Sequence, residues 1–296
     1  MLSSFIKEHK LPNNFAATAL HFYQPLAEEI YQLYKAKKSP LFVGITGCQG
    51  SGKSTMTDYL SEYIKTNYRK RVIVISIDDF YLSSQKRHQL AEEVHPLLST
   101  RGVPGTHDTS ALAITLSKLS KSETGFSIPT FNKATDEPNP KEFWQDIEQP
   151  IDIILLEGWC WGVEPQAQEH LKTPINELEM KHDPEGIWRS FVNQQLAQHY
   201  KPLYSQMDYW LVLQAPSFDC VYQWRLEQEH KLANKYADIP DAKIMNDAQV
   251  LQFTQYFQRL SVHSCHTTFE RANTVFYLDY KRRITKKSMD ASVCLS

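Results

Sequence analysis

Residues 47–54 read GCQGSGKS, and this octapeptide restricts the possible folds more than any other feature of the chain. It fits the pattern G-x-x-x-x-G-K-S/T, in which glycines let successive backbone N–H groups point inward around an anion. Lys53 then reaches the β- and γ-phosphates of a nucleotide, and the Ser54 hydroxyl can ligate Mg²⁺. The nucleotide-binding residues predicted by this motif are Gly47, Gln49, Gly50, Ser51, Gly52, Lys53, Ser54 and Thr55.

The surroundings of this loop fit the requirement for a strand before it and a helix after it. The preceding run LFVGIT is apolar, and residues 54–68 place Met56, Leu60 and Ile64 on one helical face. The N-terminus of that helix would add positive potential beside the phosphates. We therefore expect ATP as a cofactor, together with Mg²⁺.

Short apolar runs separated by helical stretches indicate a parallel sheet with both faces covered. The chain thus predicts an α/β, P-loop NTPase fold: a five-stranded parallel sheet, helices on both faces and a helical lid. The expected strands are residues 41–46, 71–77, 151–156, 209–213 and 274–278, and the later helices are 187–200, 218–234 and 247–262.

The domain organisation follows from the same patterns. Residues 14–37 have helical periodicity interrupted by Pro25, so residues 1–38 are expected to form an N-terminal helical segment. Residues 39–296 would form the nucleotide-binding domain, with the lid or helical insertion around 215–265. In the last helix, Val250, Phe253, Phe257 and Leu260 form a stripe that we interpret as core packing.

Composition excludes several classes of protein. The net charge of −2 gives no support for a nucleic-acid partner, which normally needs a basic patch. No apolar run approaches the about 18 residues of a membrane helix, and the N-terminus lacks the features of a secretory signal. The five cysteines form no CxxC pair, which is typical of reduced thiols in a cytoplasmic protein. We expect a monomer without a membrane partner.

The destination of the terminal phosphate decides between classes of P-loop protein. A GTPase should contain an Asn-Lys-x-Asp motif, but in NKATD at 132–136 the acid is one residue late. The segment DDFY at 78–81 lacks the glycine of a GTPase switch. A small-molecule kinase instead needs a base for the acceptor hydroxyl, an acid near the metal, cations and a closing lid.

Candidates for each of these parts exist. Asp78 and Asp79 follow the second predicted strand and Glu157 follows the third, at the sheet edge where α/β proteins bind ligands. The alternative for such acids is helix capping or a solvated strand end. Arg225 lies where a lid would close over the transferred phosphate, although an ordinary surface pair with Glu229 is the alternative.

The turn-rich segment RGVPGTHD at 101–108 supplies candidates for the acceptor site. Arg101 could grip a carboxylate with two hydrogen bonds, and His107 and Asp108 could bind substrate hydroxyls. Capping of the following helix by Asp108 or Thr109 is the alternative.

Several motifs in order make the chain resemble the D-glycerate 3-kinase family of P-loop kinases. That family is related to phosphoribulokinase, uridine kinase and pantothenate kinase. The resemblance runs from about residue 41 to residue 283, and its motifs are GCQGSGKST, SIDDFYLS, RGVPGTHD, PTFNK, LLEGWCWG and VYQWRLEQEHKL.

The resemblance implies roles for individual residues. Asp78 would be the catalytic base, Glu157 would lie near Mg²⁺ together with Ser54, and residues 278–283 would hold the adenine. Lys53 and Arg225 complete the implied catalytic set. The positions implied to contact the acceptor are Asp78, Tyr81, Arg101, His107, Asp108 and the segment FNK, with Lys133.

The expected activity is transfer of the γ-phosphate of ATP to a hydroxyl of a small acid, D-glycerate being converted to 3-phosphoglycerate. Two alternatives stay open at this point. One is a kinase for a pantothenate-like or nucleoside acceptor, and the other is an ATP-binding regulatory protein without efficient transfer. The cations Arg101 and Lys133, with His107, favour an acid as the acceptor.

Overall fold

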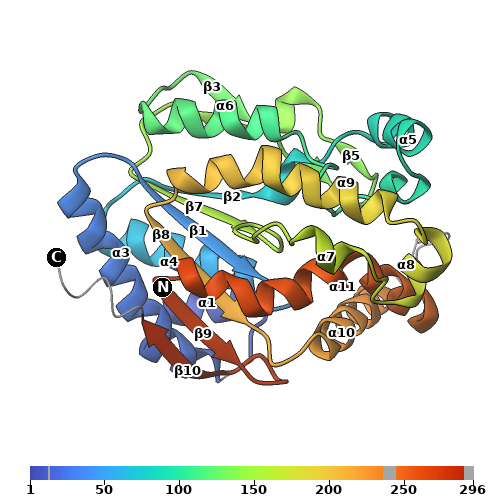
Figure 1. The fold of residues 1–296 in the computed structure, drawn as a ribbon. Coiled ribbons are helices and arrows are strands. Elements are labelled where there is room, and N and C mark those ends of the chain that lie inside the picture. The colour runs from blue at the N-terminus through green and yellow to red at the C-terminus, as the bar shows by residue number, and fades with distance from the viewer. Residues whose placement is uncertain (13, 236–244, 290–296) are drawn as a thin grey trace.

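The computed structural model describes residues 1–12, 14–235 and 245–289. Its centre is a six-stranded sheet in the order β10-β9-β8-β1-β7-β2 (Figure 1). The five predicted parallel strands are confirmed as β1 (Leu41–Gly47), β2 (Val72–Ser76), β7 (Ile153–Gly158), β8 (Tyr209–Gln214) and β9 (Thr274–Leu278). Loops that follow the carboxyl ends of these strands therefore meet at one edge of the sheet.

The sixth strand, β10 (Ile284–Met289), was not predicted, and it pairs antiparallel with β9. Its sequence ITKKSM has no apolar run because it forms the edge of the sheet, where lysines discourage pairing with other chains. The Lys286 ammonium lies 5.3 Å from the centre of the Tyr277 ring, and Lys287 Nζ lies 3.5 Å from Glu29 Oε2.

Alternation along the central strands divides the core into two layers. In β1, Phe42 packs on one face of the sheet, whereas Leu41, Val43 and Ile45 pack on the other. The second face is covered by α1 (Leu2–Glu8), α2 (Phe15–Thr18), α3 (Gln24–Lys37), α4 (Lys53–Tyr68) and α10 (Asp219–Lys235). The first face is covered by α6 (Thr109–Ser120), α9 (Ile187–Gln195) and α11 (Asp247–Thr267) (Figure 1).

Smaller elements lie outside the main sheet. Two short antiparallel pairs join β3 (Phe126–Ile128) to β6 (Gln145–Ile147) and β4 (Phe131–Asn132) to β5 (Glu137–Pro138). The other α-helices in the described part of the chain are α5 (Ser84–Glu93), α7 (Gln168–Leu171) and α8 (Glu177–His182). Of the predicted lid, residues 236–244 lie outside the described residues, as do residues 290–296 of the predicted domain.

Two predicted helices contain a wider turn that the sequence pattern did not indicate. Residues 19–23 and 196–200 form π-helical turns, each ending just before Pro25 or Pro202. Proline cannot donate to the carbonyl four residues earlier and its ring crowds that carbonyl, so a wider turn accommodates it. The predicted helical segment at 14–37 is therefore continuous from Phe15 rather than broken at the proline.

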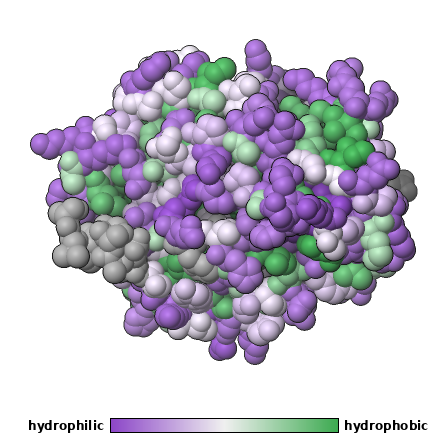
Figure 2. Space-filling view, viewed as in Figure 1, coloured by the Kyte–Doolittle hydropathy of each residue, from purple (hydrophilic) through white to green (hydrophobic). Residues whose placement is uncertain are grey.

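The surface of the protein is largely polar, as expected when the apolar side chains are buried in the two core layers. Hydrophilic side chains cover most of the face seen in Figure 2, and the hydrophobic ones form only small patches. Among the described helices, none combines the length and the apolar character needed to cross a membrane.

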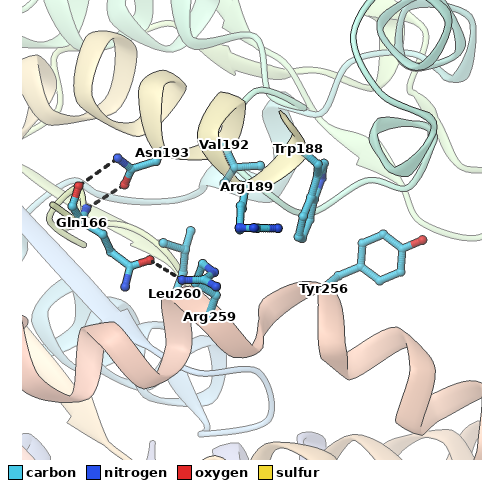
Figure 3. Close-up of a pocket in the computed structure, with 8 residues that line it drawn as sticks. All are labelled: Gln166, Trp188, Arg189, Val192, Asn193, Tyr256, Arg259 and Leu260. Atoms are coloured by element: carbon cyan, nitrogen blue, oxygen red, sulfur yellow. Dashed lines mark hydrogen bonds between the residues drawn. The ribbon is translucent and has the colours of Figure 1, made fainter. Parts of the chain in front are cut away.

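Helix α11 is fixed against α8 by the buried Arg259. Arg259 donates from Nε and Nη2 to the two carboxylate oxygens of the buried Glu179, at 2.8 and 2.6 Å. Arg259 and Arg189 of α9 both line a small cavity between α9 and α11 (Figure 3). Arg189 pairs with Asp183 at 3.0 Å. The cavity is about 10 Å³, the lower limit for one water, so it is a packing gap rather than a ligand site.

Candidate active site

The glycine loop joins β1 to α4 as predicted. Gly50 and Gly52 have φ values of 75° and 96°, a region that residues with a side chain rarely adopt. Lys53, the first residue of α4, is buried, and its Nζ donates to the carbonyls of Gly47 at 2.8 Å and Cys48 at 3.2 Å. The buried Ser51 hydroxyl has no hydrogen-bond partner among the described residues. The loop therefore retains a donor for a phosphate oxygen.

Ser54 and Glu157 lie together beside Lys53. The Ser54 hydroxyl donates to Glu157 Oε1 at 3.2 Å, and Lys53 Nζ lies 4.0 Å from Glu157 Oε2. Burial raises the pKa of Glu157, while the Lys53 ammonium opposes that shift. These oxygens fit Mg²⁺, an ion that takes few protein ligands and completes its shell with phosphates and water. Among the described residues there is no group of three or more His, Cys, Asp or Glu side chains that could hold a metal ion.

Asp78 follows β2 in a short 3₁₀ turn, Ile77–Phe80, that starts at Ser76. The Tyr81 hydroxyl donates to Asp78 Oδ1 at 2.9 Å, and Lys133 Nζ donates to Oδ2 at 2.6 Å. Burial alone would raise the pKa of Asp78, but the Lys133 ammonium and these hydrogen bonds outweigh it, so the pKa lies below the ordinary value. The carboxylate is therefore ionised and paired.

Asp78 lines a cleft beside the glycine loop, and Asp79 does not. Its Oδ1 accepts a hydrogen bond from the backbone N–H of Phe131 at 3.3 Å, which attaches the β4–β5 hairpin to the end of β2. Burial, reinforced by the nearby Asp78 charge, raises the pKa of Asp79 to about 6. The two adjacent acids thus have opposite pKa shifts because Lys133 forms a hydrogen-bonded ion pair with Asp78, whereas its weaker effect on Asp79 does not offset burial.

Most of the predicted site residues converge on one cleft. Its volume is about 230 Å³, and it runs from the glycine loop to the ends of β2 and β7. The predicted residues that line it are Gln49, Gly50, Lys53, Ser54, Asp78, Tyr81, Arg101, Lys133, Glu157 and Arg225. A nucleotide-binding end and a cation-containing end therefore share one space.

His107 and Asp108 do not line the cleft, and His107 packs against Tyr81, which does. The His107 ring stacks on Tyr81 with centroids 4.4 Å apart, and its Nδ1 lies 2.6 Å from the Tyr200 hydroxyl. Burial lowers the pKa of His107 to about 4, so the ring is neutral near pH 7. Asp108 Oδ1 accepts from the Ala111 N–H at 2.9 Å, which confirms helix capping, the alternative considered for this residue.

Arg225 on α10 borders the cleft and pairs with Glu229, at 2.6 Å between Nη2 and Oε2. The ion pair with Glu229, which was the alternative prediction for Arg225, is therefore present. The prediction that it is a surface pair is wrong, because Glu229 is buried. Its other oxygen accepts from the Met245 N–H at 3.0 Å, so the carboxylate is fixed from two sides. Arg225 also lies over the Phe253 ring, 5.6 Å from its centre.

An aromatic wall of the cleft, formed by Trp159, Phe253 and Phe257, was not predicted from the sequence. Phe257 contacts Trp159 edge to face at 5.0 Å, and Trp159 Nε1 donates to the Gly102 carbonyl at 2.9 Å. The interpretation of the α11 stripe as core packing is therefore incomplete. Helical periodicity identifies an apolar face but does not tell whether that face covers a core or a cleft.

A phosphate-binding loop at a central strand of this sheet, with a buried acid at the end of the neighbouring strand, defines a P-loop nucleotide-binding fold, and the comparisons with known proteins identify a kinase. Residues 23–128 match the model of the KAP family P-loop domain. The uncharacterized kinase mug58 of Schizosaccharomyces pombe is 31% identical over 75% of this chain and 80% of its own length. The chloroplastic D-glycerate 3-kinase of Arabidopsis thaliana is 30% identical over 76% of this chain, which spans half the length of the plant enzyme.

The fold is shared with the solved D-glycerate 3-kinase of Cryptococcus neoformans var. grubii. The TM-score is 0.76 at 24% identity, with 91% of this chain and 99% of that chain covered. The chain belongs to the same family of P-loop kinases as mug58, and it is similar to the plant D-glycerate 3-kinase. It is an ATP-dependent phosphotransferase that acts on an alcohol.

Proposed function

We propose that this kinase transfers the γ-phosphate of ATP to a hydroxyl of D-glycerate and releases 3-phosphoglycerate. The observation that carries the proposal is the pairing of Asp78 with Lys133, 2.6 Å apart, with Arg101 lining the same cleft. A base paired with one cation, in a cleft that a second cation lines, suits an acceptor that carries both a hydroxyl and a carboxylate. The similarity to the plant D-glycerate 3-kinase supports the same acceptor.

Each part of the transfer has a group assigned to it. Lys53 and the loop amides would hold the β- and γ-phosphates, and Ser54 and Glu157 would hold Mg²⁺. That ion, when bound, neutralises charge on the phosphates. Asp78 would orient the acceptor hydroxyl and take its proton, and Arg225 would stabilise the charge of the transferred group. Catalysis is then mainly positioning and charge stabilisation.

The Asp78–Lys133 pair gives a reason for selecting an acid. Asp78 is a weak base while Lys133 holds it, because the ammonium lowers its pKa. An acceptor carboxylate competes for Lys133 and would draw its ammonium away from Asp78. Without its ammonium partner, the Asp78 carboxylate would have a higher pKa and would be a stronger base for the proton of the acceptor hydroxyl. An uncharged acceptor lacks this effect.

The aromatic wall supports a second candidate, a larger acid of pantothenate type. Trp159, Phe253 and Phe257 present apolar surface to the same cleft as the polar groups. D-glycerate has little apolar surface to pack against this aromatic wall, whereas a branched alkyl chain would be buried against it. Both candidates use the same cations and base.

An acceptor panel tests the proposal directly. Purified protein with Mg²⁺ and ATP should release ADP with D-glycerate, and 3-phosphoglycerate should be the product. L-glycerate, pantothenate, uridine and ribulose 5-phosphate should each give at least about tenfold lower kcat/KM, since a missing or misplaced charge partner at a built site costs about that much.

The panel separates the open alternatives. A dominant response to pantothenate would move the assignment to the second candidate. ATP binding without ADP release for any acceptor would contradict D-glycerate transfer and favour a regulatory protein.

Arg225→Ala should lower kcat about 10²-fold, because removal of one preorganised donor to developing charge has effects of this order. The KM for ATP should change less than about threefold if the group acts mainly in the transition state. Steady-state kinetics of Arg225→Ala and Arg225→Lys measure this. The matched control is Lys181→Ala, which breaks the exposed pair with Glu177 in α8. Equal kcat values for Arg225→Ala and the control would exclude a role in transfer.

A further inference from the structure

Asp136, at the tip of the β4–β5 hairpin, lies between two arginines. Arg87 of α5 donates to its carboxylate from both terminal nitrogens, at 2.6 Å to Oδ2 and 3.2 Å to Oδ1. Arg101, which lines the cleft, donates to the same Oδ1. Asp136 itself has a φ of 62°, a left-handed conformation that is uncommon for residues with a side chain. Asp136 thus combines a left-handed turn conformation with a carboxylate that is bound by two arginines.

We propose that Arg87 and Asp136 are positioning residues of the acceptor site. They hold Arg101 and the loop that carries Lys133 so that both cations receive the carboxylate of one acceptor. This inference rests on the proposed function, because it assumes an acid as the acceptor.

The Arg87 side chain has little freedom to move because it is buried. Its side chain is 1% exposed, whereas that of Asp136 is 44% exposed. A buried guanidinium needs a counter-charge, and Asp136 is its ion-pair partner in the described part of the chain. The carboxylate cannot move toward solvent without leaving that charge unpaired. Arg101 is thereby tied to the interior through Asp136 rather than free on the surface.

The charges of this cluster match an anionic ligand. Arg87, Asp136 and Arg101 together carry one net positive charge, and the Lys133–Asp78 pair carries none. A monoanion at Arg101 therefore neutralises the group. Arg101 Nη1 donates to Asp136 and Nη2 to the Lys133 carbonyl, so the N–H of Nε and the second N–H of each terminal nitrogen remain for the carboxylate of a ligand.

The same hairpin joins the two cations. Arg101 Nη2 donates to the Lys133 carbonyl at 3.4 Å, and the Arg101 guanidinium lies 5.6 Å from the centre of the Phe131 ring. Asp79 holds the Phe131 N–H at the base of the hairpin. The positions of Arg101 and Lys133 are thus set by one unit, and that unit is anchored at Asp136.

Asp136→Asn tests the role because it keeps the shape of the side chain and removes the charge. We expect the KM for D-glycerate to rise about tenfold or more, with the KM for ATP and kcat within about threefold, as for loss of a charge-assisted ground-state contact. Asp136→Glu should recover part of the affinity. The matched control is Glu137→Gln, one residue away, whose carboxylate binds Ser84 and not Arg101. Its KM for D-glycerate should stay within about twofold of the wild-type value.

The outcomes separate the two proposals. Wild-type turnover of D-glycerate with an unchanged KM in Asp136→Asn overturns the positioning role and leaves the proposed function standing. Equal loss in Glu137→Gln, or an equal rise in the KM for ATP, assigns Asp136 a general structural role and also overturns it. If Asp136→Asn does not fold, Arg101→Lys keeps the Arg87–Asp136 pair, and an unchanged KM for D-glycerate there overturns the role. A wild-type protein that phosphorylates no acid overturns both proposals.

Discussion

Asp78→Asn should lower kcat by about 10³–10⁴-fold, toward the upper end of what a positioned general base contributes. The Kd for ATP should stay within about threefold of the wild-type value, because the side chain is not part of the glycine loop. Isothermal titration with ATP and the rate of ADP release with D-glycerate measure the two quantities separately.

The substitution is close to isosteric, so its effect on folding should be small. The amide oxygen of the new side chain would still accept from the Tyr81 hydroxyl, which donates to Asp78 Oδ1 at 2.9 Å in the wild-type protein. The Lys133 side chain is 60% exposed, and its ammonium would return to water when the carboxylate is removed. Loss of this partly exposed pair should cost about 1 kcal/mol or less of unfolding free energy.

Asp79→Asn is the matched control for this prediction. The amide oxygen can still accept from the Phe131 N–H, and the side chain does not line the cleft. Its kcat should fall less than about tenfold. Similar losses in the two variants would show a general effect on the end of β2, and an unchanged kcat in Asp78→Asn would remove Asp78 from the mechanism.

The parts of the fold that were predictable depend on short-range patterns. Five buried strands have apolar runs of ordinary length, and the glycine loop needs a strand before it and a helix after it. The strand-end acids Asp78 and Glu157 line the cleft with the loop because parallel strands end at one edge of the sheet. Chain order and strand direction were sufficient for these predictions.

The parts that were not predictable depend on contacts between distant segments. The edge strand β10 lacks an apolar face, so its pairing with β9 leaves no periodic signal. Phe253 and Phe257 look like core residues in a helix, and only the tertiary fold turns them toward the cleft. Asp136 lies in a polar loop, and its two arginine partners are 49 and 35 residues away along the chain.

Lys53→Ala should lower kcat/KM for ATP by about 10³-fold or more, because the ammonium is the principal cation of the loop and acts on the charge that moves during transfer. Unlike Asp78→Asn, this variant should also weaken ATP binding, by about tenfold or more, since the contact is made in the ground state. The combination of a binding defect and a rate defect distinguishes the two roles.

The environment of Lys53 predicts a further consequence for Glu157. Lys53 Nζ is 4.0 Å from Glu157 Oε2, and the ammonium lowers the pKa of a carboxyl that burial raises. Removal of Lys53 should therefore raise the pKa of Glu157 further and favour its neutral form. A neutral Glu157 is a poor ligand for Mg²⁺, so the variant should need more Mg²⁺ for half-maximal activity and should recover part of its activity at higher pH.

Lys65→Ala on the exposed face of α4 provides the control, because it makes the same substitution in the same helix away from the loop. Thermal unfolding of both variants shows whether α4 stays folded, and titration with ATP and with Mg²⁺ shows whether the loop still binds. Full activity in Lys53→Ala would be incompatible with phosphate binding by this loop. Loss of ATP binding without any change in the Mg²⁺ requirement would keep Lys53 in the site but would contradict its coupling to Glu157.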